Sequence, residues 1–158
     1  MRNGVVFVDT SVLVNVLRVP GSGNAGLTQS DIERFGKLLN DGTQLVLPLA
    51  TIIETGNSIA RVRGGERHRC TTTFITFLRS SLAVQAPWVP AGFADNTELL
   101  THLLDGSGTL PTLAELMNTG VGTGDASILA EVAEFRKKIP SATPVEIWTH
   151  DVGLGAYT

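Results

Sequence analysis

The sequence feature that most constrains the fold is an apolar run, residues 5–8, that ends directly at Asp9. A short continuous apolar run near the start of a chain is typical of a strand buried on both faces, as in parallel sheets. Such sheets bind ligands at the carboxyl ends of their strands, which is where Asp9 lies. An ionised carboxylate among apolar neighbours is costly unless it is paired or bound to a cation, so the rest of the chain must supply its partner.

Size and composition indicate a globular protein with a single domain, residues 1–158. Hydrophobic residues make up 42% of the chain and charged residues 17%, which is too apolar for disorder. The net charge of −3 gives no overall basic field, which argues against a sequence-specific DNA-binding protein. Cys70 is the one cysteine, so no intrachain disulfide can form. No apolar run approaches the ~20 residues that span a bilayer, and we expect a cytoplasmic protein without a membrane partner.

Strands are expected to alternate with helices along the chain. Further strands are predicted over residues 44–49, 84–89 and 145–149, and helices over 10–18, 30–40, 51–62, 66–81, 95–104, 112–118 and 125–138. This alternation predicts an α/β fold, a three-layer α/β/α sandwich around a mostly parallel central sheet.

A glycine-rich segment, residues 20–26, contains a literal G-x-G-x-x-G pattern. In dinucleotide-binding proteins this pattern follows a strand and opens a helix, and an acidic residue follows about 20 positions later. Here the glycines follow a predicted helix, and no acidic residue closes a second strand at that distance. The segment is therefore predicted to be a surface loop.

Four acidic residues stand where a parallel sheet would bring them together. Asp9 and Asp151 follow the first and last strands, Glu54 is predicted in the first turn of a helix, and Asp125 stands at a helix start. Each also has a local alternative: the aspartates could cap or favour helix starts, and Glu54 could complete a capping box with Thr51. Four carboxylates on one edge would repel one another unless they were protonated or bridged by a cation.

An all-oxygen ligand set favours a hard ion, Mg²⁺ or Mn²⁺. Zinc is disfavoured, because Cys70 and the three histidines, His68, His102 and His150, show no ligand spacing. Bound Mg²⁺ or Mn²⁺ can activate a water molecule and neutralise the charge that develops on a phosphodiester. The pattern predicts metal-dependent phosphodiester hydrolysis.

Four segments together resemble the motifs of PIN-domain ribonucleases, and most closely those of VapC-like toxins from prokaryotic toxin–antitoxin pairs. They are Val8–Leu13, Glu54 near the start of its helix, Gly124–Ala130 and Trp148–Asp151, and they span nearly the whole chain. The resemblance implies a three-layer domain that cleaves RNA endonucleolytically with Mg²⁺ or Mn²⁺. It also implies inhibition by an antitoxin protein, and homodimers. The chain departs from a compact toxin by extra length in the glycine-rich loop and around residues 91–110.

The resemblance also assigns roles to individual residues. The catalytic and metal-binding residues would be the four acids, Asp9, Glu54, Asp125 and Asp151. Ser11 and Thr149 would orient carboxylates through their hydroxyl groups, unless these only satisfy local backbone turns. Asn57, one helical turn after Glu54, would face either the site or solvent.

Basic residues cluster over residues 61–69, and one histidine stands beside the last acid. The arginines, Arg61, Arg63, Arg67 and Arg69, would steer the RNA backbone or bind acidic groups of an antitoxin; the alternative is a solvated helix face. His150 would be a general base or a turn residue that points elsewhere.

Two other functions compete with the nuclease. The same fold could serve as an RNA-binding or assembly module without turnover. A phosphatase that forms an aspartyl-phosphate would need a second acid two residues after Asp9, where Ser11 stands.

Overall fold

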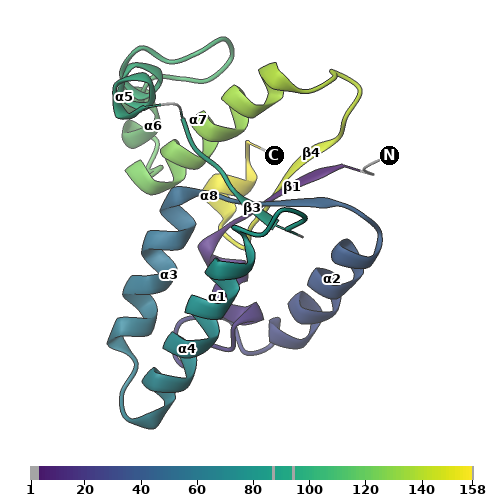
Figure 1. Ribbon diagram of the computed structural model, residues 1–158. Coiled ribbons are helices and arrows are strands. Elements are labelled where there is room, and N and C mark those ends of the chain that lie inside the picture. The colour runs from purple at the N-terminus through teal and green to yellow at the C-terminus, as the bar shows by residue number, and fades with distance from the viewer. Residues whose placement is uncertain (1–3, 87, 94, 158) are drawn as a thin grey trace.

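The computed structural model describes residues 4–86, 88–93 and 95–157. Within these residues one parallel sheet has the strand order β3-β2-β1-β4 and is flanked by helices (Figure 1). The strands are β1 (Val5–Val8), β2 (Gln44–Leu47), β3 (Trp88–Pro90) and β4 (Val145–Trp148). The helices are α1 (Thr10–Val16), α2 (Thr28–Asn40), α3 (Leu49–Arg61), α4 (Gly65–Ser80), α5 (Asn96–Asp105), α6 (Leu113–Asn118), α7 (Thr123–Lys138) and α8 (Val152–Gly155). The predicted α/β fold with a parallel sheet is confirmed.

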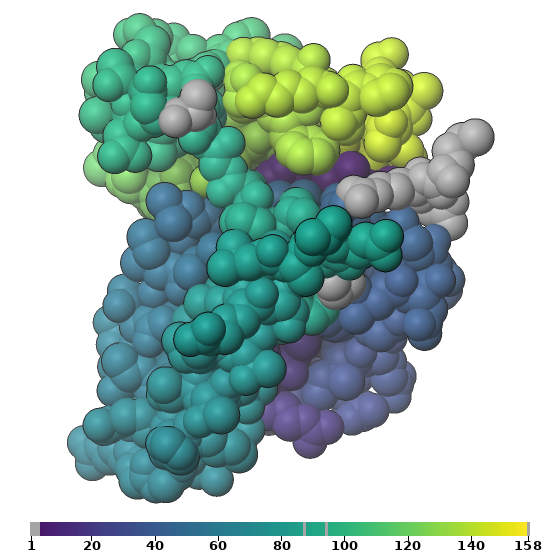
Figure 2. Space-filling view, in the orientation of Figure 1, coloured from purple at the N-terminus to yellow at the C-terminus, as the bar shows by residue number. Residues whose placement is uncertain are grey.

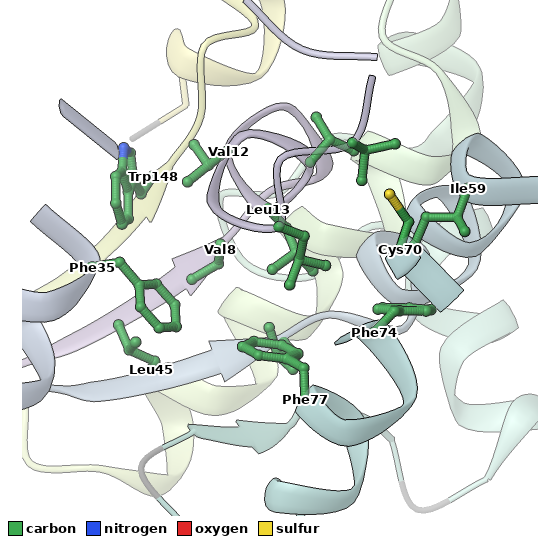
Figure 3. Close-up of a cluster of buried hydrophobic side chains, with 14 of the residues drawn as sticks. Val8, Val12, Leu13, Phe35, Leu45, Ile59, Cys70, Phe74, Phe77 and Trp148 are labelled. Carbon is green, nitrogen blue, oxygen red and sulfur yellow. The ribbon is translucent and has the colours of Figure 1, made fainter. Parts of the chain in front are cut away.

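Alternate residues of the strands enter two separate cores, one on each face of the sheet. Val8 and Leu45 pack with side chains of α1 to α4 (Figure 3). Phe7, Val46 and Ile147 pack with side chains of α5 to α8. Successive strand side chains point to opposite faces, so a strand covered on both faces must be apolar throughout. In Figure 2 the green and yellow-green helices of one layer lie above the blue and teal helices of the other.

The side on which new strands are added to the sheet changes beside β1. The connections from β1 to β2 and from β2 to β3 extend the sheet on one side, whereas β4 lies on the other side of β1. Val8 is in register with Trp148, and the backbone N–H of Asp9 donates to the Trp148 carbonyl oxygen at 3.1 Å. In open α/β sheets such a switch point opens a crevice at the carboxyl ends of the two strands, where ligands bind. Asp9 and Asp151 follow those two strand ends.

Several predicted boundaries were wrong. The third strand begins at Trp88 instead of residue 84, since Val84 is exposed and residues 83–86 form a turn; Pro87 lies outside the described residues. Helix α3 begins at Leu49, directly after Pro48, which is two residues earlier than predicted. The short helix α8 was not predicted. None of the described helices is long and apolar enough to cross a bilayer.

The glycine-rich segment is an exposed loop between α1 and α2, as predicted. Its Gly23 lies directly against Asn15 of α1, so a Cβ atom at this position would collide with the Asn15 side chain. Glycine is required here because the loop backbone approaches α1 so closely.

Candidate metal centre at the carboxyl edge of the sheet

Asp9 is buried at the end of β1, with 5% of its surface exposed, and one of its carboxylate oxygens is fixed by three donors. Asp9 Oδ2 accepts from Ser11 Oγ at 2.6 Å, Thr149 Oγ1 at 2.8 Å and the Ser11 backbone N–H at 3.3 Å. Short hydrogen bonds to an ionised carboxylate are strong and fix its orientation. Because all three bind Oδ2, Oδ1 is the oxygen available to a cation.

The same hydroxyl groups also hold the β4–α8 turn. Ser11 Oγ accepts from the His150 backbone N–H, and Thr149 Oγ1 accepts from the Asp151 backbone N–H, each at 2.9 Å. Asp151 caps α8, since its Oδ1 accepts from the Leu154 N–H at 3.0 Å. The local capping role of Asp151 and its position at the sheet edge therefore coexist. One network of hydroxyl groups fixes the positions of both strand-end acids.

Glu54 reaches the same edge from the second turn of α3. Thr51 is fully buried and donates to the Val8 carbonyl oxygen at 2.9 Å, which fastens α3 to the end of β1. The alternative of a capping box between Thr51 and Glu54 is thus wrong, because both lie inside the helix. Glu54 Oε2 accepts from Thr10 Oγ1 at 2.9 Å. Gly124 of α7 lies so close that a Cβ atom there would collide with Glu54 Oε1.

Asp125 completes the group from the first turn of α7. Burial, and after it the nearby charges of Asp9, Asp151 and Glu54, together raise the pKa of Asp125 from the ordinary 3.8 to about 6. All four acids line one cavity of about 350 Å³, together with Thr10, Ser11, Gly122 and Gly124. None of these lining residues is an arginine or a lysine. The cavity is thus a concentration of negative charge without a cationic partner among its described walls.

The donor set of this cavity fits a hard divalent ion. It consists of carboxylate and hydroxyl oxygens, which Mg²⁺ and Mn²⁺ prefer. Among the described residues, no three of the four acids bring ligand atoms within 4.8 Å of one another. An ion here would therefore keep water molecules in its shell, as Mg²⁺ commonly does in protein sites.

A second cluster of possible metal ligands, formed by α5 and α7, does bring its ligand atoms that close together. Glu98 and His102 of α5 and Glu134 of α7 offer ligand atoms within 4.8 Å of one another. Glu134, however, also pairs with Lys137 and Lys138 at 3.2 Å each, and their hydrogen bonds hold the pKa of Glu134 below its ordinary value. The lysines already neutralise this carboxylate, so the group is a weaker cation site. The i, i+4 spacing of Glu98 and His102 was visible in the sequence, but the contact with α7 was not.

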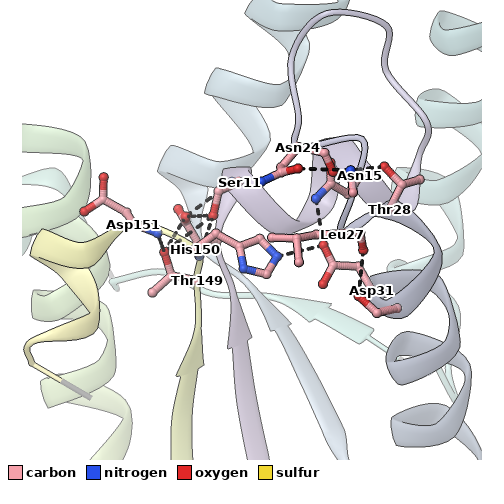
Figure 4. A network of polar contacts seen from close by, with 12 residues as sticks. Ser11, Asn15, Asn24, Leu27, Thr28, Asp31, Thr149, His150 and Asp151 are labelled. Carbon is pink, nitrogen blue, oxygen red and sulfur yellow. Dashed lines mark hydrogen bonds and ion pairs between the residues drawn. The ribbon is translucent and has the colours of Figure 1, made fainter.

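His150 does not face the acidic cavity. Its Nε2 lies 2.8 Å from Asp31 Oδ2 of α2, and the same oxygen accepts from Asn15 Nδ2 at 2.7 Å (Figure 4). Asp31 and Asn15 are both buried. This geometry favours the second interpretation of His150, a turn residue that points elsewhere. It also ties the β4–α8 turn to α1 and α2.

The remaining predicted residues lie away from the cavity. Asn57 is exposed on α3 and is not among the residues that line it. Arg61, Arg63, Arg67 and Arg69 are exposed around the α3–α4 turn. At 1.5 Å per residue, the first of these lies roughly 10 Å along the α3 axis from Glu54. Arg69 pairs with Glu66 at 2.8 Å and donates to the Arg18 carbonyl oxygen at 3.0 Å, so part of this cluster is occupied by local contacts.

Comparison with known proteins gives support at the level of the fold. No protein-family model matches the chain, and no curated protein matches it. A solved structure does: the crystal structure of VapBC2 from Rickettsia felis bound to a DNA fragment from their promoter. The match has a TM-score of 0.52 and 14% sequence identity, and covers 92% of this chain and 99% of that one. At this identity the similarity shows a shared fold, an α/β sandwich with a parallel central sheet.

Proposed function

We propose that this protein is a Mg²⁺- or Mn²⁺-dependent endoribonuclease, the toxin of a VapBC-type toxin–antitoxin pair. The observation that carries the proposal is the single cavity that gathers Asp9, Glu54, Asp125 and Asp151 from four different elements at the switch point of the sheet. The similarity in fold to a chain of VapBC2 supports the same class of protein. In this proposal residues 1–158 form one domain, and the protein acts in the cytoplasm.

In this proposal the chain's own residues position the reaction. A bound divalent ion supplies an activated water molecule and neutralises the charge that develops on the cleaved phosphodiester. Asp9 would bind the ion through Oδ1, because Ser11 and Thr149 hold Oδ2. Glu54 and Asp125 would complete the carboxylate ligands. Asp151, exposed at the rim and fixed by its capping bond, would orient water or a second ion.

The proposal includes two protein partners. A homodimer is supported by Leu100 and Leu104, which lie one turn apart on α5 and are each more than half exposed. Exposed apolar side chains that adjoin one another are typical of protein contact surfaces when they form a contiguous patch. A cognate antitoxin would inhibit the enzyme, and the arginines of the α3–α4 turn offer cations for acidic groups of that antitoxin or for the RNA backbone.

Removal of divalent metal tests the proposed reaction. Purified protein with Mn²⁺ is expected to cleave single-stranded RNA, to lose cleavage on addition of EDTA, and to regain it when excess Mn²⁺ is restored. Denaturing gels of a labelled RNA measure each state. Cleavage that persists in EDTA would contradict the metal mechanism. RNA binding without cleavage under any metal condition would favour the alternative, a catalytically silent RNA-binding or assembly module.

Gly124→Ala is expected to weaken the binding of Mn²⁺ without unfolding the protein. The added Cβ atom would displace Glu54 Oε1, so the Mn²⁺ concentration for half-maximal cleavage should rise by about tenfold, as for other disturbed ligand positions. Gly36→Ala is the matched control, because Gly36 is also helical and nothing lies within 4 Å of its added Cβ atom. An unchanged Mn²⁺ requirement in Gly124→Ala would argue against Glu54 as a ligand.

A further inference from the structure

A second pocket opens beside the acidic cavity and shares two of its residues. This pocket has a volume of about 270 Å³ and lies between α3, α5 and α7. Glu54 and Gly124 belong to both the pocket and the acidic cavity. Its other walls are largely apolar and include Leu49, Ile53, Leu99 and Leu103. The pocket therefore adjoins the place where the phosphodiester would be cleaved.

One buried carboxyl group among these apolar walls lacks a full set of partners. Glu131 of α7 lines the pocket and is 4% exposed. Its Oε1 accepts from the Leu49 backbone N–H at 3.4 Å, whereas its buried Oε2 has no hydrogen-bond partner. Burial raises the pKa of Glu131 to about 7. A buried polar atom without a partner is destabilising, so Oε2 marks a position where a ligand's hydrogen bond would be favourable.

We propose that this pocket holds the base of the nucleotide next to the cleaved phosphodiester, and that Glu131 selects bases with an exocyclic amino group. This inference rests on the proposed nuclease function. A nucleotide whose phosphate lies among the four acids would carry its base into the adjoining pocket. The apolar walls suit the flat faces of a base, and a carboxyl oxygen accepts well from an amino group such as that of cytosine. Uracil has no exocyclic amino group, and its one base donor, the ring N3–H, is flanked by two carbonyl oxygens that repel a carboxylate, so it would pair less well with Oε2.

Cleavage of four matched RNAs tests the selection. They differ in one base beside the scissile phosphodiester, and the substitution is repeated on its other side. The wild type is expected to cleave the RNAs with adenine, cytosine or guanine about tenfold faster than the one with uracil on one of the two sides. Glu131→Leu removes the acceptor and fills the pocket with apolar atoms, so the rate ratio should fall to near one. Glu33→Leu, at an exposed carboxylate of α2, is the control and should keep the wild-type ratio.

A binding measurement separates this inference from the nuclease proposal. The metal-free Asp9→Asn variant is titrated with AMP, CMP, GMP and UMP by NMR, with and without Glu131→Leu. Weaker binding of UMP that disappears in the double variant supports the pocket even if no RNA is cleaved. Equal binding of all four nucleotides, or a base preference that survives Glu131→Leu, would overturn it. A change in thermal stability alone, with the base preference kept, would likewise overturn it by assigning Glu131 a purely structural role.

Discussion

Asp9→Asn is expected to lower the rate of RNA cleavage by more than about 100-fold while the protein stays folded. Loss of a residue that only orients a metal ligand costs about 10- to 100-fold, and loss of a ligand itself should cost more. The asparagine keeps the size of the side chain but removes the negative charge that Ser11 and Thr149 hold in place. Single-turnover cleavage at saturating Mn²⁺ measures the effect, and circular dichroism checks the fold.

Asp105→Asn is the matched control for this variant. Asp105 is an exposed carboxylate at the end of α5, and it is not among the residues that line the acidic cavity. The control should cleave RNA as the wild type does. Equal rates for Asp9→Asn and the wild type would remove Asp9 from the mechanism.

Asp125→Asn is expected to stabilise the metal-free protein at pH 8. The pKa of Asp125 is raised to about 6, so between pH 4 and pH 6 the native state binds more protons than the unfolded state does. Native stability must therefore fall as the pH rises through this range, and asparagine removes that loss. The rise of this pKa from 3.8 to about 6 corresponds to at most about 3 kcal/mol, which solvent screening of this partly exposed carboxyl group reduces to about 1 kcal/mol.

Urea unfolding at pH 8 and pH 4 measures this difference. The gain from Asp125→Asn should be present at pH 8 and absent at pH 4, where the wild-type carboxyl group is protonated. Mn²⁺ should reverse the order at pH 8, because an ion at 100 times its Kd stabilises a binding-competent protein by about 2.7 kcal/mol. Destabilisation of the metal-free protein by the same amount at both pH values would show that Asp125 has no charge repulsion to relieve.

The acids that directly follow strands of the sheet could be predicted from the sequence. Val5–Val8 had to be a buried strand, and a parallel sheet places the residues after its strands on one edge, so Asp9 and Asp151 could be paired without coordinates. Asp125 followed from its place at a helix start. The helix predicted over residues 112–118 was also confirmed, and the two hydrogen bonds of the capping box that opens it at Thr112 are local.

What depended on packing between distant segments could not be predicted. The direction of His150 is set by Asp31, 119 residues earlier, which lies inside the helix predicted over residues 30–40 and gave no sign of this contact. The third strand was misplaced because apolar residues 82–84 lie in an exposed turn, whereas Trp88 is the residue that packs on Phe77, with ring centroids 4.3 Å apart. Glu131 gave no sequence signal, since a glutamate within a helix is ordinarily solvated.

The central claim is that four distant acids share a divalent ion at the carboxyl edge of the sheet. A crystal structure of the protein soaked in Mn²⁺, with anomalous diffraction data, tests it most directly. We expect an anomalous peak in the cavity bounded by Asp9, Glu54, Asp125 and Asp151, with carboxylate oxygens and water as ligands. A peak only at Glu98, His102 and Glu134, or no peak in the acidic cavity at saturating Mn²⁺, would contradict the account.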